Sequence, residues 1–452
     1  MTGAEYIRNA YLLKENDRPA WLPFVGCHGA FLTGVSAQNY LSSSELIVKG
    51  LEEAIRRYTP DGLPVTFDLQ MEAEALGCRL LYSPSNPPAV VSHPLEEGVK
   101  LEELPDFISI LAKREGRTGE ALSAARTISS LHPEVAFFGL VTGPLTLALH
   151  LMGTSLFTEM FENPEKVESV IEYCTGIAAA MSGAYIEAGC SVIAVVDPMT
   201  SQIDPVTFET FVLNSSKKLF SKIREMNSLS SFFVCGQAEH NLELMAACGP
   251  DNISVDENIP LTEVKRVAGA AGISFGGNLK LTTTLLLGTE EECERDALEC
   301  IDTGGNRGFV LAPGCDLPMN VPVKNVEAVS RIVKDRYRQD ILRNTSMEVS
   351  QDEVPDISSR WCMGKAVVDV VTLDSASCAP CSYMMELVSR LLPAFGDKVE
   401  IHEHKIKTYE GLAMMKALGV TKIPTICING EPLFISQTPP LSKLTEAVKE
   451  RI

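Results

Sequence analysis

The chain has 452 residues, of which 45% are hydrophobic and 22% are charged, and its formal net charge of -20 gives a pI near 4.9. This length allows two or three globular domains, and the negative charge disfavours nucleic acid and anionic membranes as partners, since both are polyanions. The N-terminal residues lack the pattern of an export signal, and no apolar run is long enough for a membrane span, so the sequence predicts a cytoplasmic protein.

Short apolar runs alternate with amphipathic helical stretches along the first three quarters of the chain. Ranges 43–58, 163–189 and 288–305 place apolar residues at helical spacing with charges on the opposite side. The predicted strands end at or near Cys27, Asp68, Thr142, Asp197, Cys235, Asp256, Asn278 and Cys315. Eight strand-then-helix units predict an α/β protein with a (β/α)8 barrel over residues 1–342.

Most of the predicted strands end in a polar or thiol side chain. Each one alone is typical of a strand end or a helix cap. In a barrel, however, the carboxyl ends of all strands lie on one face, where the active site forms. We therefore expect these side chains to meet there: Cys27, Asp68, Asp197, Cys235, Asp256, Asn278 and Cys315.

A second domain follows a polar stretch without periodicity at 343–361, which we interpret as a linker. Residues 362–452 read as strand, helix, strand, helix, two strands joined by an Asn429-Gly430 turn, and helix. Cys378 and Cys381 form a Cys-x-x-Cys pair at the start of the first of these helices, and Pro424 precedes the third strand.

This small domain resembles the thioredoxin and glutaredoxin fold over nearly all of residues 365–452. A helix N-terminus lowers the pKa of a thiol placed there, so Cys378 is expected to attack and Cys381 to resolve the mixed disulfide. The resemblance implies that Pro424 is the family's cis-proline beside the dithiol. An inert fold and a zinc half-site remain the alternatives for the Cys pair.

The predicted barrel resembles a second known family. Stretches such as "FFGLVTGPLTLALHLMG" and, most distinctively, "PGCDLPMNVPVKNVEAV" are similar to the uroporphyrinogen decarboxylase superfamily from about residue 5 to 340. Within it, the chain looks most like the branch of methylcobamide:thiol methyltransferases. That branch implies a corrinoid protein or free methylcobamide (methylcobalamin) as substrate, and a small thiol or other one-carbon acceptor.

The features of the decarboxylase branch are mostly missing. Its members bind substrate carboxylates through an arginine-rich N-terminal loop, whereas this chain has no arginine between Arg18 and Arg56. Asp68 matches the decarboxylase aspartate, but His150 replaces a tyrosine and Cys315 replaces a histidine. Buried carboxylates without cationic partners cost several kcal/mol, so a porphyrinogen substrate is disfavoured.

In the methyltransferase branch, a His-x-Cys pair and a distant Cys bind zinc, which activates the acceptor thiol. Cys235 and Cys315 match the two cysteines, but Phe233 replaces the histidine. The alternatives are two packed thiols, or a redox or substrate-thiol role. Candidates for a third zinc ligand are Glu239, His240, Cys27 and His28, or no residue at all.

The sequence therefore predicts a methyltransferase that moves a methyl group between a methylated corrinoid and a thiol or other one-carbon acceptor. Cys235, Cys315, Asp68 and His150 are its predicted catalytic residues, and His28, Asp197, Asp256 and Asn278 are its predicted substrate-binding residues. The dithiol domain would keep the barrel thiols or the acceptor reduced. A tetrapyrrole decarboxylase and a non-catalytic corrinoid-binding or redox accessory protein are the alternative functions.

Overall fold

The structure is a computed structural model that describes residues 1–452 except 346–354, 356, 358–359, 362–363 and 377. The chain divides into two compact units, Met1–Leu342 and Arg343–Ile452. Among the described helices, none combines the length and apolar character that crossing a membrane requires.

A parallel sheet of eight strands forms the centre of the first unit, in the order β1-β10-β9-β8-β7-β6-β5-β2. The strands are β1 (Ala20–Trp21), β2 (Gly62–Pro64), β5 (Ala136–Thr142), β6 (Val192–Val196), β7 (Leu229–Val234), β8 (Asn252–Val255), β9 (Ser274–Leu279) and β10 (Phe309–Pro313). Asp61, just before β2, donates its backbone N–H to the Trp21 carbonyl at 2.9 Å and accepts the Trp21 N–H on its carboxylate at 2.8 Å. The nearly closed sheet confirms the predicted barrel.

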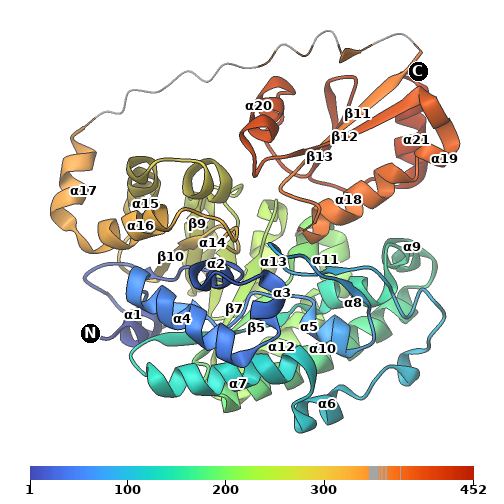
Figure 1. Cartoon of the computed structure of the whole chain (residues 1–452). Coiled ribbons are helices and arrows are strands. Elements are labelled where there is room, and N and C mark those ends of the chain that lie inside the picture. Colours follow the sequence, from blue (N-terminus) through green and yellow to red (C-terminus); the bar gives the residue numbers. More distant parts are fainter. Residues whose placement is uncertain (346–354, 356, 358–359, 362–363, 377) are drawn as a thin grey trace. The chain divides into compact units, whose positions relative to one another are not determined.

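Helices surround the barrel strands (Figure 1). They are α1 (Gly3–Tyr11), α2 (His28–Thr33), α3 (Ala37–Leu41), α4 (Ser44–Tyr58), α5 (Met71–Ala75), α6 (Phe107–Lys113), α7 (Gly116–Leu131), α8 (Pro144–Met152), α9 (Ser155–Glu162), α10 (Pro164–Glu187), α11 (Pro205–Phe211), α12 (Leu213–Glu225), α13 (Leu242–Ala247), α14 (Leu261–Ala271), α15 (Glu290–Gly304), α16 (Val323–Lys334) and α17 (Arg336–Arg343). Shorter turns are η1 (Leu101–Glu103), η2 (Pro198–Gln202), η3 (Glu239–Asn241) and the π-helical η4 (Leu281–Leu286). The antiparallel pair β3 (Leu80–Leu81) and β4 (Ala89–Val90) lies outside the barrel sheet and was not predicted.

The first barrel strand is shorter than its apolar sequence suggests. The prediction ended it at Cys27, whereas β1 stops at Trp21 and the last sheet hydrogen bond runs from the Leu22 N–H to the Leu311 carbonyl. Pro23 follows and has no N–H to donate, so the chain leaves the sheet there. Cys27 instead precedes α2.

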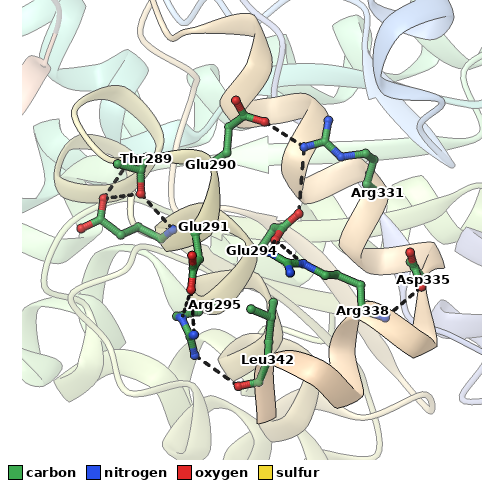
Figure 2. A network of polar contacts seen from close by, with 10 residues as sticks. Thr289, Glu290, Glu291, Glu294, Arg295, Arg331, Asp335, Arg338 and Leu342 are labelled. Carbon is green, nitrogen blue, oxygen red and sulfur yellow. Dashed lines mark hydrogen bonds and ion pairs between the residues drawn. The ribbon is translucent and has the colours of Figure 1, made fainter. Parts of the chain in front are cut away.

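A network of ion pairs joins the last helices of the first unit (Figure 2). Glu294 of α15 accepts two hydrogen bonds from Arg338 of α17, at 2.8 and 2.7 Å. Arg331 of α16 donates to Glu290 of α15 at 2.9 Å, and Arg295 of α15 donates to the Leu342 carbonyl at 3.2 Å. These contacts hold α17 against the barrel up to the end of the first unit.

The second unit contains a four-stranded sheet in the order β12-β11-β13-β14. Its strands β11 (Ala366–Thr372) and β12 (Val399–Lys405) are parallel, whereas β13 (Thr425–Ile428) and β14 (Glu431–Ile435) run antiparallel to their neighbours. The helices are α18 (Ala379–Ser389), α19 (Leu392–Phe395), α20 (Tyr409–Ala417) and α21 (Leu441–Lys449), with the short turn η6 (Gly396–Lys398).

Part of the predicted linker packs within the second unit. Ile357 is buried with Val371 and Cys427, and Trp361 packs against the same cluster. Arg360 donates to the buried carboxylate of Asp369 at 2.7 Å. The rest of the predicted linker at 346–354, 356 and 358–359 lies outside the described residues.

Candidate active site

Two thiols from opposite parts of the barrel sheet meet at the carboxyl ends of its strands. Cys235 directly follows β7, and Cys315 lies two residues after β10. Both are half-buried and pack against the same apolar cluster of the barrel interior, and Cys235 lies near enough to lower the pKa of the Cys315 thiol. Two strands, β8 and β9, separate β7 from β10 in the sheet order, so the closed curvature of the barrel brings the two sulfurs together.

Three phenylalanine rings line the barrel interior against which this thiol pair packs. Phe233 of β7 lies with its ring centroid 5.1 Å from that of Phe24 and 5.9 Å from that of Phe67. Phe24 and Phe67 are 5.8 Å apart. The position at which the family resemblance expects a zinc-binding histidine is therefore part of an apolar aromatic cluster.

Acidic side chains surround the Cys315 sulfur. The hydrogen bond from Cys235 lowers the pKa of the Cys315 thiol, but burial and the charges of Asp256 and Asp316 outweigh it, so the pKa lies above its ordinary value. Burial also raises the pKa of Asp256, although Asn258 and the Gly236 backbone donate hydrogen bonds to its carboxylate. This environment favours the protonated form of the Cys315 thiol.

Glu257 lies beside Asp256 and against the loop that carries Cys315. A side chain on Gly314 would place its Cβ 2.7 Å from the Glu257 backbone nitrogen as well as 2.2 Å from its Oε2, and because the backbone cannot move aside cheaply, glycine is required for this close approach. Burial and then the charge of Asp256 raise the pKa of Glu257 well above its ordinary value. This environment disfavours the charged form of Glu257.

Asp68 is engaged in a buried ion pair. Its side chain is 0% exposed and contacts Arg117 of α7, and it accepts the Gln70 N–H at 2.9 Å. Arg117 also donates to Glu74 at 2.7 Å. The guanidinium is therefore neutralised by two carboxylates.

The two histidines predicted for the site are buried and neutral. His28 contacts the Met319 carbonyl at 2.8 Å through Nδ1 and the Tyr58 hydroxyl at 2.6 Å through Nε2, and burial lowers its pKa to about 4. His150 of α8 is 2% exposed, and neither ring nitrogen has a hydrogen-bond partner among the residues that the structure describes. Burial, with a smaller contribution from His93, lowers the pKa of His150 to about 3.

Asp197 and Asn278 bind backbone groups at the ends of their strands. Asp197 accepts the N–H groups of Leu145 and Thr146 at 3.0 and 2.9 Å, at the start of α8. Burial raises the pKa of Asp197 to about 6. The Asn278 amide donates to the carbonyls of Asp256 and Ile259 at 3.1 and 2.7 Å, which fixes the loop after β8.

The candidates for a third zinc ligand have other partners. Both ring nitrogens of His28 are engaged, His240 Nε2 lies 2.9 Å from the Ile203 carbonyl, and Glu239 accepts from Gln237 at 3.1 Å. Cys27 is buried at 1% exposure. Within the described part of the chain, no three His, Cys, Asp or Glu side chains are grouped so that they could hold a metal ion.

The second unit has its own thiol pair. The Cys381 thiol donates to the Cys378 sulfur at 2.7 Å, and Cys378 is the residue that precedes α18. Cys381 is buried, and its pKa lies well above its ordinary value. Burial is the main cause, and the hydrogen bond with Cys378 and the charge on Cys378 add to it. The Ile423–Pro424 peptide bond is cis.

The family model for uroporphyrinogen decarboxylase (URO-D) matches residues 8–336. The chain belongs to the URO-D family. This family match covers almost all of the first unit and ends before the second.

Within the URO-D family, the chain is similar to methyltransferases and to decarboxylases. It is 28% identical over 280 residues to the methylcobamide:CoM methyltransferase MtbA of Methanosarcina acetivorans, which covers 61% of this chain and 80% of the relative. The uroporphyrinogen decarboxylase of Streptomyces avermitilis is 26% identical over 307 residues, which cover 65% of this chain and 81% of the relative. The solved structure of a methyltransferase from Methanosarcina mazei superposes with a TM-score of 0.66 at 25% identity, covering 74% of this chain and 98% of the other.

Several residues that shape the site were missed by the sequence analysis. Arg117 carries no local signal, because only the fold brings α7 to Asp68. Glu257 and Asp316 adjoin the predicted residues Asp256 and Cys315, so their positions in the sequence could have indicated them. The aromatic cluster under the thiols required knowledge of which side of each strand faces inward.

Proposed function

We propose that this protein is a methyltransferase that moves a methyl group between a methylcobamide and a thiol or another one-carbon acceptor. The meeting of Cys235 and Cys315 at the barrel mouth carries this proposal, since the family resemblance assigns acceptor activation to these two positions. The similarity to methylcobamide:CoM methyltransferases supports it. The corrinoid, free or bound to a protein, is a substrate in this reaction.

For a thiol acceptor, the sulfur must lose its proton and attack the methyl carbon. A sulfur–carbon bond forms, the cobalt–carbon bond breaks, and the electron pair of that bond stays on the cobalt. We assign proton acceptance to Asp256, whose raised pKa makes it a stronger base than an exposed aspartate. The Cys235 and Cys315 thiols would orient the acceptor sulfur, above an aromatic floor that excludes water.

Zinc does not fit the donor set around the thiol pair. A catalytic zinc site uses three protein ligands, whereas Phe233 occupies the expected histidine position and His28, His240 and Glu239 are engaged elsewhere. We therefore assign no step of the reaction to zinc, and we expect purified protein to contain far less than one zinc per chain.

For the second unit we propose dithiol–disulfide exchange on a thioredoxin-like fold. The support is the order of its strands, the 2.7 Å contact of Cys378 with Cys381, and the position of Cys378 before α18. A tethered dithiol acts at high effective concentration on other groups of the same chain. Its role would be to keep the barrel thiols or the acceptor thiol reduced.

The decarboxylase alternative has weaker support from the site residues. A porphyrinogen carries several carboxylates that need cationic partners, and Arg117 beside Asp68 is already neutralised by two carboxylates. His28 and His150 are neutral at physiological pH. A non-catalytic accessory protein would bind a corrinoid without methyl turnover.

An anaerobic assay with methylcobalamin and a small thiol tests the proposal, because the absorption spectrum of the corrinoid changes when the methyl group leaves. We expect turnover that falls about 100-fold or more in Cys235→Ala and Cys315→Ala. Cys248→Ala is the matched control, since this buried thiol of the first unit lies outside the site and donates to the Leu244 carbonyl.

Each alternative function predicts a different result. Corrinoid binding without turnover for any acceptor would favour the accessory protein. Release of carbon dioxide from uroporphyrinogen, measured as coproporphyrinogen formation, would favour the decarboxylase. Zinc near one per chain that disappears in Cys235→Ala would overturn the metal-free assignment.

A further inference from the structure

We infer that three glutamines at the barrel mouth, Gln70, Gln202 and Gln237, bind carboxamide groups of the corrinoid through their side-chain carbonyl oxygens. Because a methylcobamide is the substrate in the proposed function, the inference rests on that function. It concerns the residues that hold the edge of the corrin ring.

The three glutamines follow strands that form one continuous arc of the barrel. Gln70 directly precedes α5 in the segment after β2, Gln202 is the last residue of η2 after β6, and Gln237 lies shortly after β7. In the sheet, β2, β5, β6 and β7 are consecutive neighbours, so these segments leave the barrel at one side of its carboxyl end. Leu69, next to Gln70, packs against the same apolar cluster as Cys235. The glutamines therefore border the candidate active site.

Hydrogen bonds tie neighbouring segments of this arc together. The Thr142 hydroxyl, at the end of β5, donates to the Leu69 carbonyl beside Gln70 at 2.9 Å. The Asn241 side chain, in the segment after β7, donates to the Thr200 carbonyl in η2 at 3.0 Å. The backbone that carries the glutamines is therefore held in place by contacts that do not involve their side-chain oxygens.

The side-chain oxygens of these glutamines are buried and unpaired. None of the three accepts a hydrogen bond from the described residues of the protein. In Gln237, which is 8% exposed, the Nε2 group donates to Glu239 at 3.1 Å while the oxygen has no partner. Buried carbonyl groups are normally paired, and an unpaired one costs free energy. Since no hydrogen bond holds these oxygens, none has to break when they turn toward a ligand.

Unpaired acceptors select a ligand that offers N–H or O–H donors. The edge of a corrin ring carries primary carboxamides, and each presents N–H donors together with one carbonyl oxygen. A carboxylate at neutral pH has no hydrogen to donate, so it would bring oxygen against oxygen. The glutamine oxygens therefore suit the carboxamides of a corrinoid.

Arg117 offers a donor for the carbonyl end of a carboxamide. Its side chain is 7% exposed, and its Nη2 has no partner among the described residues. Arg117 contacts the Asp68 carboxylate, which also accepts the Gln70 N–H at 2.9 Å, so Arg117 and Gln70 lie on the same carboxylate. Because Asp68 and Glu74 already neutralise the guanidinium, its remaining N–H suits a neutral carbonyl better than a second anion would require.

Binding of dicyanocobinamide to the full-length protein tests the inference without methyl transfer. This corrinoid keeps the carboxamides of the ring edge and has no methyl group on cobalt. Equilibrium dialysis, read by the absorbance of the corrinoid, gives Kd. We expect Kd to rise about tenfold in Gln237→Met and about 100-fold or more in Gln70→Met/Gln202→Met/Gln237→Met, because methionine has a similar length but is a weak acceptor.

Gln339→Met is the matched control. Gln339 is also a buried glutamine of the first unit, but it lies on α17 and donates to the Ile332 carbonyl at 2.7 Å. Its Kd should equal that of wild type. The glutamine variants at the barrel mouth should melt no lower than wild type, because each loses an unpaired buried carbonyl, so weaker binding would report lost contacts rather than unfolding.

A change of ligand tests the same contacts on the wild-type chain. The heptamethyl ester of dicyanocobyrinic acid is also uncharged at the ring edge, but its esters keep the carbonyl oxygens and lack the N–H donors. We expect wild type to bind dicyanocobinamide at least about tenfold more tightly than the ester. The triple glutamine variant should bind the two corrinoids alike, since the preference comes from the glutamine oxygens.

The outcomes separate the inference from the proposed function. Equal Kd values for dicyanocobinamide in wild type and the triple variant, equal Kd values for the amide and the ester on wild type, or no binding of either corrinoid, would each show the inference to be wrong. Methyl transfer is then still judged by its own assay. Binding that prefers the amide and depends on the glutamines, without turnover of methylcobalamin for any acceptor, would overturn the proposed methyl transfer and leave the glutamine assignment in place.

Discussion

The two thiol pairs of this protein are built in opposite ways. Cys378 and Cys381 lie one helical turn apart at the start of α18, and their sulfurs are 2.7 Å apart. Cys235 and Cys315 come from strands that are not neighbours in the barrel sheet, and only the closed sheet brings them together. Local sequence is therefore enough for the first pair, while the second depends on the whole barrel.

Their surroundings differ as well. Cys381 is fully buried and donates to the half-buried Cys378, an asymmetry typical of one attacking and one resolving thiol. Cys235 and Cys315 are similarly exposed, and the nearby charges of Asp256 and Asp316 raise the pKa of Cys315. The asymmetry of the second unit's pair fits the thiol exchange that we propose for it, and the surroundings of the first unit's pair fit the proposed role of orienting a substrate sulfur.

Removal of Cys378 and Cys381 should have the largest effect, because it eliminates one of the two thiol pairs and leaves the other in place. We expect Cys378→Ser/Cys381→Ser to abolish reduction of a protein disulfide such as insulin, while methyl transfer continues when dithiothreitol is supplied. Without added reductant, methyl transfer should decline over successive turnovers. Cys427→Ala, which removes another buried thiol of the second unit, is the control. Full turnover of the double variant without reductant would refute the coupling.

A change that destabilises the barrel should affect Cys235 and Cys315 but not Cys378 and Cys381. Arg117→Leu leaves the Asp68 carboxylate, which is 0% exposed, without its cation, and breaking a buried pair in this way costs about 3–5 kcal/mol. We expect the urea-induced unfolding free energy of the first unit to fall by that amount, with disulfide exchange by the second unit unchanged.

The control for Arg117→Leu is an exposed pair on the same unit. Arg266, whose side chain is 58% exposed, contacts Glu243 and Glu263, and such pairs contribute about 0–1 kcal/mol. Arg266→Ala should therefore change the unfolding free energy little. If the two variants lost the same unfolding free energy, the buried Asp68–Arg117 pair would contribute no more to stability than an exposed ion pair.

The charge around the barrel pair predicts which acceptor thiols it prefers. Asp256 and Asp316 act on Cys315, and His28 and His150 are neutral above their pKa values of about 4 and about 3. A negative charge roughly 10 Å from a carboxylate is repelled by about 1–2 kcal/mol at an effective dielectric constant near 20. We expect kcat/KM to be about tenfold higher for cysteamine than for 2-mercaptoethanesulfonate, with the uncharged 2-mercaptoethanol between them.

This series keeps the ethanethiol part constant and changes only the charge at the other end. The difference should shrink in Asp316→Asn and at high salt. A preference for 2-mercaptoethanesulfonate would show that Asp256 and Asp316 do not repel anionic acceptors. It would still support methyl transfer to a thiol. A lack of turnover with all three thiols would count against a thiol acceptor.

A further effect is expected from pH, through His150, a buried histidine of α8. His150 titrates at a pKa of about 3 in the folded chain and near 6.5 when unfolded, so its neutral form is retained on folding. Stability is therefore fully present above pH 6.5 and is lost as pH falls toward 3, with a slope of about 1.4 kcal/mol per pH unit. We expect His150→Gln to reduce that slope in denaturation measured between pH 6.5 and 4.5.

The matched control for this pH effect is His132→Gln, because the His132 side chain is partly exposed and contacts Glu134 at 3.1 Å. It should leave the slope close to that of wild type. An unchanged slope in His150→Gln would show that His150 is protonated in the folded chain, and hence that its surroundings are more polar than the structure indicates.

Sequence reasoning predicted the barrel because each of its strands is a local apolar run between helices of clear periodicity. Helices α4, α10 and α15 lie within one or two residues of their predicted ranges. The error at β1 has a local cause, since Pro23 ends the pairing of an otherwise apolar run. The pair β3 and β4 was missed because two-residue strands leave no periodicity to detect.

For the site, sequence selected residue types and strand ends but not the partners of the side chains. Asp197 and Asn278 were predicted to bind substrate, a role that stays a prediction, and in the structure both bind backbone groups. Asp68 was chosen without Arg117, which lies on a distant helix. Partners of this kind depend on contacts between segments far apart in the chain, which no single-sequence pattern encodes.

The sequence by itself determined the alternation of barrel strands and helices, the position of the Cys378 and Cys381 pair before a helix, and the phenylalanine at position 233 where the resemblance expects a histidine. Periodicity, helix starts and residue identity are local properties, and they can be read directly. Only the tertiary structure decided that Cys235 meets Cys315 over three aromatic rings and beside acidic groups. The physical reason is that the closure of the parallel sheet, rather than any neighbouring residue, sets which strand ends face each other.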